Sequence, residues 1–224
     1  MTMLNAKLAS TKLSFFSIWE GFPYPGNMGH LLLDNGYEEV KTPDSADILV
    51  FNGGQDIATS IYGENPVFDG IPGRKTNRDL FEVELYDRFV GQKFFLGICR
   101  GAQLLNCLNG GKLWQHVNNH QRDHNMTDLT TGETIKVTST HHQMMRPNSD
   151  LAQIIGVSSE STRKNAERDH ETGDMKPDIE AVWYRNTRSL CIQGHPEYVP
   201  GSRFAEWSLE LMNKKYEEQL VCVG

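Results

Sequence analysis

One cysteine lies in a sequence context that could support nucleophilic chemistry. Cys99 stands between Gly97 and Gly101 and directly follows the apolar run 93–98. A strand that passes through G-x-C-x-G into a helix is the thiol form of the nucleophile elbow, a tight turn at the edge of a sheet. The turn puts the sulfur at a helix N-terminus, where free N–H groups and the helix dipole favour a thiolate. An isolated buried cysteine is usually structural, but two glycines at this spacing favour a nucleophile.

A histidine and a glutamate near the end of the chain could complete this chemistry. The apolar run 189–193 leads into Gly194, His195, Pro196 and Glu197. A thiol nucleophile needs an imidazole that accepts its proton and later protonates the leaving amine. The imidazole in turn needs an acceptor on its second nitrogen. Because Pro196 restricts the backbone between them, Glu197 can fold back onto His195.

Three histidines, His116, His120 and His124, recur at four-residue spacing. On a helix this spacing would place them on one face, where imidazoles can bind a metal ion. The residues between them include two Asn, one Gln and one Asp, which favour a loop over a helix. The remaining cysteines form no C-x-x-C pair and no zinc-ligand pattern. We therefore predict no metal site and no cofactor.

Strands and helices alternate in the half of the chain that contains Cys99. The expected strands are 13–19, 47–51 and 93–98, and the expected helices are 27–35, 76–90 and 101–108. In the helix at 76–90, Leu80, Val83, Tyr86 and Val90 recur at helical spacing as an apolar face. This order predicts an α/β fold with an open, mostly parallel, flavodoxin-like sheet and helices on both faces.

The second half of the chain is richer in expected strands. They are 133–139, 151–158, 179–184 and 189–193, and a closing helix is expected at 202–215. The polar stretch 160–177 separates two of these strands, and its composition predicts a mobile loop.

Size and charge narrow the class of protein. The chain has 224 residues, which fits a single domain over 1–224. Its net charge of −7 argues against a nucleic-acid partner. No apolar run approaches the roughly 18 residues of a membrane span, so no membrane partner is expected. The first residues lack the apolar core of a secretory signal, and we expect a cytoplasmic protein.

Taken together, these segments resemble the class I glutamine amidotransferase family. G-I-C-R-G-x-Q at 97–103 and G-H-P-E at 194–197 match its two most specific motifs in the right order. Within that superfamily, the chain looks most like the gamma-glutamyl hydrolase branch, including gamma-glutamyl-GABA hydrolases. The narrower match is carried by 52–57, 62–64, 78–82, 104–111 and 139–143.

The resemblance implies a Cys-His-Glu triad that cleaves an amide. Cys99 would attack the carbonyl, His195 would act as the base and Glu197 would orient it. The N–H groups of Gly54 and Arg100 would form the oxyanion hole. The resemblance also implies four residues that hold the amino and carboxylate ends of a glutamyl group: Gln103, Ser139, Thr140 and His141.

Three functions are compatible with these residues. The first is a stand-alone hydrolase that cleaves the γ-amide of glutamine or a γ-glutamyl compound through a γ-glutamyl thioester. The second is a glutaminase subunit that delivers ammonia to a separate synthetase or ligase, because 224 residues leave no room for a synthetase domain. The third is a non-catalytic binding protein on the same fold, which the intact triad disfavours.

Overall fold

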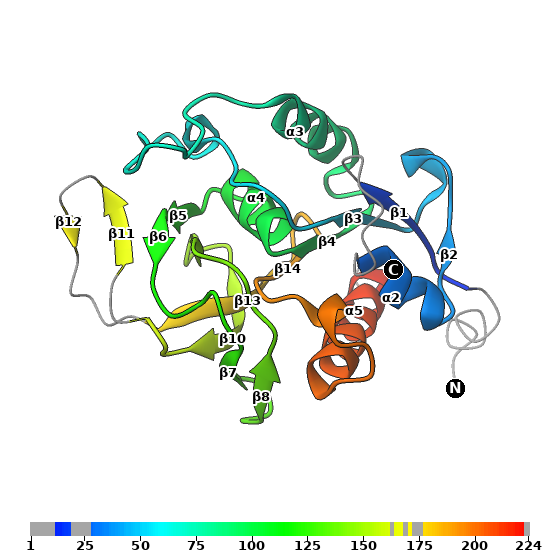
Figure 1. Cartoon of the computed structure of the whole chain (residues 1–224). Helices are drawn as coiled ribbons and strands as arrows, with labels where there is room; N and C mark the ends of the chain where they lie inside the picture. The colour runs from blue at the N-terminus through cyan, green and yellow to red at the C-terminus, as the bar shows by residue number, and fades with distance from the viewer. Residues whose placement is uncertain (1–11, 19–27, 162–163, 168–169, 172–176, 222–224) are drawn as a thin grey trace.

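A computed structural model describes residues 12–18, 28–161, 164–167, 170–171 and 177–221. Residue 19, the end of an expected strand, and residue 27, the start of an expected helix, lie outside this part. Cys222, one of the cysteines that form no zinc-ligand pattern, lies outside it too. A nine-stranded sheet of order β2-β1-β3-β4-β14-β13-β10-β7-β8 crosses the molecule (Figure 1). In the described residues, no helix combines the length and the apolar character needed to cross a bilayer.

Five neighbouring strands form the parallel half of this sheet. They are β2 (Glu38–Glu39), β1 (Ser14–Ile18), β3 (Ile48–Phe51), β4 (Phe94–Ile98) and β14 (Ser189–Ile192). Their spatial order is the flavodoxin-like 2-1-3-4-5 order, with β14 as the fifth strand. The predicted α/β fold is confirmed.

The rest of the sheet is antiparallel and comes from the strand-rich second half. It contains β13 (Asp178–Tyr184), β10 (Gln153–Ser158), β7 (His124–Asp128) and β8 (Thr134–Val137). Two smaller sheets pair β12 (His170–Glu171) with β11 (Lys164–Glu167) and β6 (His116–Val117), and β5 (Lys112–Trp114) with β9 (Met144–Arg146). The stretch 160–177, expected to be a loop, therefore contains two strands.

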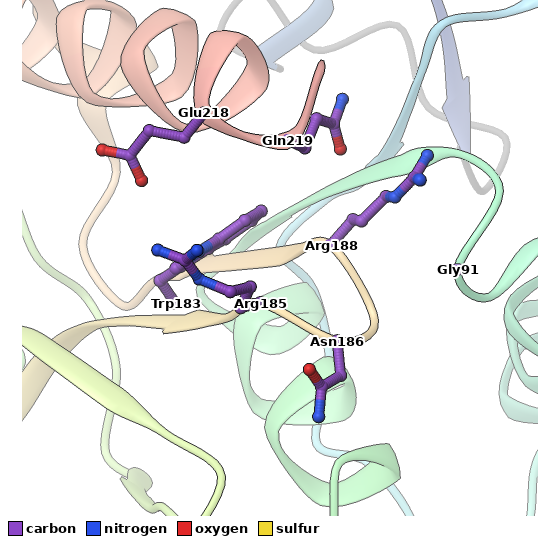
Figure 2. Close-up of a pocket in the computed structure, with 7 residues that line it drawn as sticks. All are labelled: Gly91, Trp183, Arg185, Asn186, Arg188, Glu218 and Gln219. Atoms are coloured by element: carbon purple, nitrogen blue, oxygen red, sulfur yellow. The ribbon is translucent and has the colours of Figure 1, made fainter. Parts of the chain in front are cut away.

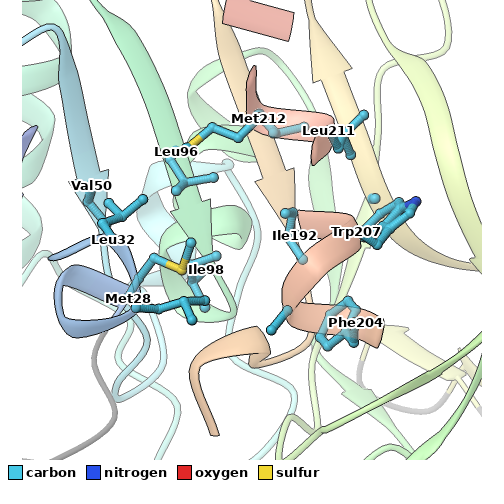
Figure 3. Packing of buried hydrophobic residues seen from close by; sticks show 14 of the residues in the cluster. Met28, Leu32, Val50, Leu96, Ile98, Ile192, Phe204, Trp207, Leu211 and Met212 are labelled. Carbon is cyan, nitrogen blue, oxygen red and sulfur yellow. The ribbon is translucent and has the colours of Figure 1, made fainter. Parts of the chain in front are cut away.

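Helices cover both faces of the parallel half. One face packs against α2 (Met28–Asp34) and α5 (Arg203–Val221), and the other packs against α3 (Asn77–Phe89) and α4 (Arg100–Leu108). Alternate side chains of a strand point to opposite faces, so Leu96 and Ile98 join Met28 and Met212 in the first layer (Figure 3). Phe95 joins the second layer. Three 3-10 helices complete the elements: η1 (Pro43–Ser45), η2 (Thr59–Ile61) and η3 (Pro196–Tyr198).

The face that α3 buries differs from the expected one. Leu80 is 53% exposed, whereas Asp79 and Glu82 are fully buried. Thr76 caps the helix in a capping box with Asp79. The prediction that Leu80 packs inward was wrong, because the first turns of α3 are anchored by ion pairs to Arg100 rather than by apolar contact.

Candidate active site

Cys99 occupies a strained turn between β4 and α4. Its φ of 50° and ψ of −107° lie in a region that residues with a side chain rarely adopt. A Cβ on Gly101 would overlap the Phe51 carbonyl group, and one on Gly97 would lie 2.7 Å from the Ala102 nitrogen. Both flanking residues must therefore be glycine, and the sharp turn predicted from G-x-C-x-G is present.

His195 and Glu197 form a fixed pair at the end of β14. The Nδ1 atom of His195 lies 2.7 Å from Glu197 Oε1. The Tyr198 ring stacks on the imidazole, with centroids 4.2 Å apart and planes 7° apart. The backbone N–H of His195 donates to the Thr138 carbonyl at 2.8 Å. With Nδ1 donating to the carboxylate, the Nε2 lone pair is left for a proton from a nucleophile.

The topology brings Cys99 to this pair. Since β4 and β14 are parallel neighbours, Cys99 and His195 follow the carboxyl ends of adjacent strands. Burial by itself lowers the pKa of His195, but the charge of Cys99, a hydrogen bond to Cys99 and the Glu197 carboxylate hold that pKa well above its usual range. A Cβ on Gly53 would lie 2.8 Å from His195 Cε1 and 3.6 Å from Cys99 Cβ. Gly53 therefore lies against both residues. The sequence shows only that Gly53 belongs to a Gly-Gly pair after β3, which does not predict this contact.

The two expected oxyanion donors lie next to each other in space. Gly54 has a φ of 149°, and a Cβ there would overlap Arg78 Nη1 and lie 3.5 Å from Arg100 Cδ. Arg100 is the first residue of α4, where N–H groups have no partner within the helix. Their role as an oxyanion hole stays a prediction.

A buried ion network holds these segments together. The Arg100 guanidinium binds Asp79 Oδ1 at 2.6 Å and also Glu82 Oε2. Arg78 Nε donates to Glu82 Oε1 at 2.9 Å. Arg78 Nη2 donates to the carbonyls of Asn52 and of the next residue, at 2.9 and 3.1 Å. The start of α3 therefore clamps the elbow to the segment that follows β3.

Breaking this clamp should destabilise the fold. Asp79→Asn keeps a capping oxygen for α3 but removes one of the two buried carboxylates that balance the Arg100 charge, which should lower the free energy of unfolding by roughly 3 kcal/mol. The matched control is Asp44→Asn, whose pair with Arg88 is more than half exposed on both sides and should cost less than about 1 kcal/mol. Urea unfolding of both variants measures the difference. Equal losses would contradict a structural clamp.

Three of the four residues expected to hold a glutamyl group have hydrogen-bond partners within the protein. Gln103 Nε2 donates to the Gln143 carbonyl at 3.2 Å, and His141 Nδ1 donates to the same carbonyl at 2.9 Å. Ser139 Oγ donates to a backbone carbonyl of another loop, and Thr140 is exposed. Substrate contact at this segment stays a prediction.

A pocket of about 340 Å³ adjoins the segment that follows β3. Two carboxylates and two imidazoles face it, and its lining residues are Asp56, Phe68, Asp69, Gly70, Ile71, His116 and His142. His142 Nε2 lies 3.1 Å from Asp56 Oδ1, and that hydrogen bond raises the pKa of His142. Three residues span at most about 10 Å, so the backbone of Asp56 lies within that distance of Gly53, which packs against His195 and Cys99.

A second pocket lies at the opposite edge of the sheet. It has a volume of about 270 Å³ and is lined by Gly91, the β13–β14 turn and the end of α5 (Figure 2). Gly91 precedes β4 and the turn precedes β14, whereas Cys99 and His195 follow those strands. This pocket therefore has no part in the chemistry at the elbow.

The histidine-rich stretch is not helical. His116 lies in β6 and His124 begins β7, so the preference for a non-helical structure is confirmed. The structure nevertheless brings His120 and His124 together with His141 and Glu180 in a buried cluster. The four-residue spacing in the sequence picks out His120 and His124, but nothing in it links them with His141 and Glu180, which come from other segments.

Known proteins are similar to this chain over most of its length. Residues 34–197 match the peptidase C26 family. The chain is 25% identical to a putative glutamine amidotransferase-like protein, YvdE, of Lactococcus lactis subsp. lactis, over 95% of this chain and 88% of that protein. It is also 25% identical to the carbamoyl phosphate synthase small chain of Aquifex aeolicus, over 53% of this chain and 29% of that protein.

A solved structure shares the fold. It is that of a putative GMP synthase subunit from Thermoplasma acidophilum, with a TM-score of 0.63 and 13% identity. The superposition covers 93% of this chain and 96% of that chain.

Proposed function

This chain belongs to the peptidase C26 family, within the class I glutamine amidotransferase superfamily, and we propose on that basis that it hydrolyses γ-glutamyl amides as a stand-alone enzyme. The observation that carries the proposal is the buried pair of His195 and Glu197 beside the Cys99 elbow. A thiol, an imidazole and an orienting carboxylate in this order are what acyl transfer from an amide requires.

The proposed reaction has two steps. The Cys99 thiolate attacks the γ-carbonyl carbon, and the resulting oxyanion is stabilised by the N–H groups of Gly54 and Arg100. The C–N bond breaks as His195 gives its proton to the amine, which leaves a γ-glutamyl thioester on Cys99. In the second step His195 takes a proton from water, and the hydroxide displaces the thiolate to release glutamate.

We assign the leaving amine to the pocket beside Asp56. Asp56 is paired with His142, whereas Asp69 adds an exposed carboxylate to the same pocket. A carboxylate at this position suits a leaving group that carries a positive charge. The apolar Phe68 and Ile71 side chains can contact its carbon chain.

A second candidate function rests on the relatives. One of them is the small chain of a carbamoyl phosphate synthase, and a protein of the same fold is a putative GMP synthase subunit. By analogy, this chain would release ammonia from glutamine for a separate synthetase. The chemistry at Cys99 would be the same, and only the acceptor of the nitrogen would differ.

Glutamate release by the protein alone distinguishes the two functions. A panel of γ-glutamyl amines and free glutamine is incubated with the wild type and with Cys99→Ala as the blank. We expect faster release from a γ-glutamyl amine that carries a second amino group than from glutamine. Slow release from glutamine alone would favour the synthetase-linked function. Absence of release from the whole panel would overturn the stand-alone hydrolase.

A further inference from the structure

Four buried side chains from separate segments converge beneath the antiparallel half of the sheet. They are His120 in the β6–β7 loop, His124 at the start of β7, His141 in the β8–β9 loop and Glu180 on β13. Each of these side chains is at most 1% exposed. One ring nitrogen of each histidine and a carboxylate oxygen of Glu180 all lie within 4.8 Å of one another.

The outer nitrogen of each histidine has a hydrogen-bond partner. His124 Nδ1 lies 3.0 Å from the Arg122 carbonyl, and His141 Nδ1 lies 2.9 Å from the Gln143 carbonyl. A carbonyl can only accept, so both nitrogens carry the hydrogen. His120 Nε2 lies 2.9 Å from a carboxylate oxygen of Asp178. A carbonyl or carboxylate behind each imidazole is the usual support of metal-binding histidines, because it fixes the tautomer and the ring orientation.

The inner nitrogens converge on Glu180. His124 Nε2 and His120 Nδ1 lie 3.0 and 3.3 Å from Glu180 Oε1, and His141 Nε2 lies 3.8 Å from Oε2. Within the described residues, His120 Nδ1, His141 Nε2 and Glu180 Oε2 make no hydrogen bond. Neutral imidazoles in these tautomers offer only lone pairs towards an anionic carboxylate. Such a buried cluster is satisfied either by protons on the inner nitrogens or by a cation held between the rings and the carboxylate.

We propose that His120, His124, His141 and Glu180 bind a zinc ion in a structural site. Imidazole and carboxylate ligands suit zinc, and four protein ligands with no open position are typical of its structural sites. Tetrahedral ligands at about 2.0–2.1 Å from zinc lie roughly 3.3 Å from one another, close to the separations of His120 and His124 from Glu180. A divalent ion also balances the two carboxylates of Asp178 and Glu180.

The ion would join loops that border the catalytic base. The β8–β9 loop, which supplies His141, begins at Thr138, and Thr138 exchanges hydrogen bonds with the backbone of His195. Zinc would fix this loop to β13 and to the β6–β7 loop. The site is a positioning element, since none of its four ligands belongs to the proposed triad, and His141, bound to zinc, would not hold the glutamyl group as the resemblance implies.

Zinc binding is tested on the full chain in the Cys99→Ala background, so that the proposed nucleophile cannot hold the metal. The protein is stripped with a chelator, incubated with zinc and desalted, and bound metal is measured by mass spectrometry. We expect about one zinc ion per chain and a rise in Tm of several degrees. Glu180→Gln should lose both, whereas the matched control His116→Gln, outside the cluster, should keep them.

A second measurement does not depend on ligand variants, which can fail to fold. X-ray absorption of the zinc-loaded Cys99→Ala chain should show nitrogen and oxygen ligands, imidazole scattering and no sulfur. Less than about a tenth of an equivalent of zinc on a folded chain would overturn the site, as would equal binding by a folded Glu180→Gln variant or sulfur ligation. These readouts need no substrate, so they stand apart from the hydrolase proposal.

Discussion

Replacement of Cys99 by alanine is expected to abolish amide cleavage while the fold persists. Loss of the nucleophile of a triad lowers kcat by about 10⁴-fold or more. Alanine keeps the same Cβ in the strained turn, and its backbone N–H can still donate to the Ile192 carbonyl at 2.9 Å. The variant should therefore retain the circular dichroism and the unfolding midpoint of the wild type. Glutamate release by the two proteins measures the loss.

Thiol labelling supplies an independent check on the same residue. Burial raises the pKa of the Cys107 and Cys191 thiols, so neither should compete for an alkylating reagent. We expect brief treatment with iodoacetamide to modify Cys99 first and glutamine to slow that reaction. Activity retained by a pure Cys99→Ala preparation would contradict the mechanism. Labelling of Cys107 or Cys191 before Cys99 would contradict the assignment of the reactive thiol.

Replacement of Glu197 by glutamine is expected to lower kcat by roughly 10³- to 10⁴-fold. The carboxylate accepts the Nδ1 hydrogen of His195 at 2.7 Å and stabilises the imidazolium. A glutamine amide can turn its NH₂ group towards Nδ1 and favour the wrong tautomer. The matched control is Glu217→Gln on the exposed side of α5, which should leave kcat unchanged. Equal effects of the two substitutions would mean that another group orients His195.

The pH profile separates an orienting role from general damage. His195 holds its proton below its pKa, which Cys99 and Glu197 raise well above the usual range. In the wild type, the loss of activity at alkaline pH should therefore set in as the pH rises through this raised pKa. The Glu197→Gln variant loses one of the causes that raise the pKa of His195. The alkaline limb of its pH profile should therefore move to lower pH. An unchanged limb with a reduced kcat would indicate a different role for Glu197.

The sequence alone was sufficient to predict the parallel strands of the core and to select the candidate triad residues, because the signals for both are local. The run before Cys99 is apolar at every position, which is typical of a strand buried on both faces. A side chain at position 97 would overlap backbone atoms of the elbow, and one at position 101 would overlap Phe51 at the end of β3. His195 and Glu197 are two residues apart, so their pairing is visible in the printed chain.

Tertiary structure alone decided the contacts between distant segments. Arg100 meets Asp79 across 21 residues, and this ion pair, not apolar spacing, sets the buried face of α3. His124 meets Glu180 across 56 residues. A periodicity rule applies within one element and cannot say which loops a sheet brings together. The elbow could thus be predicted from neighbouring residues, whereas the clamp and the histidine cluster exist only because the folded sheet juxtaposes segments far apart in the chain.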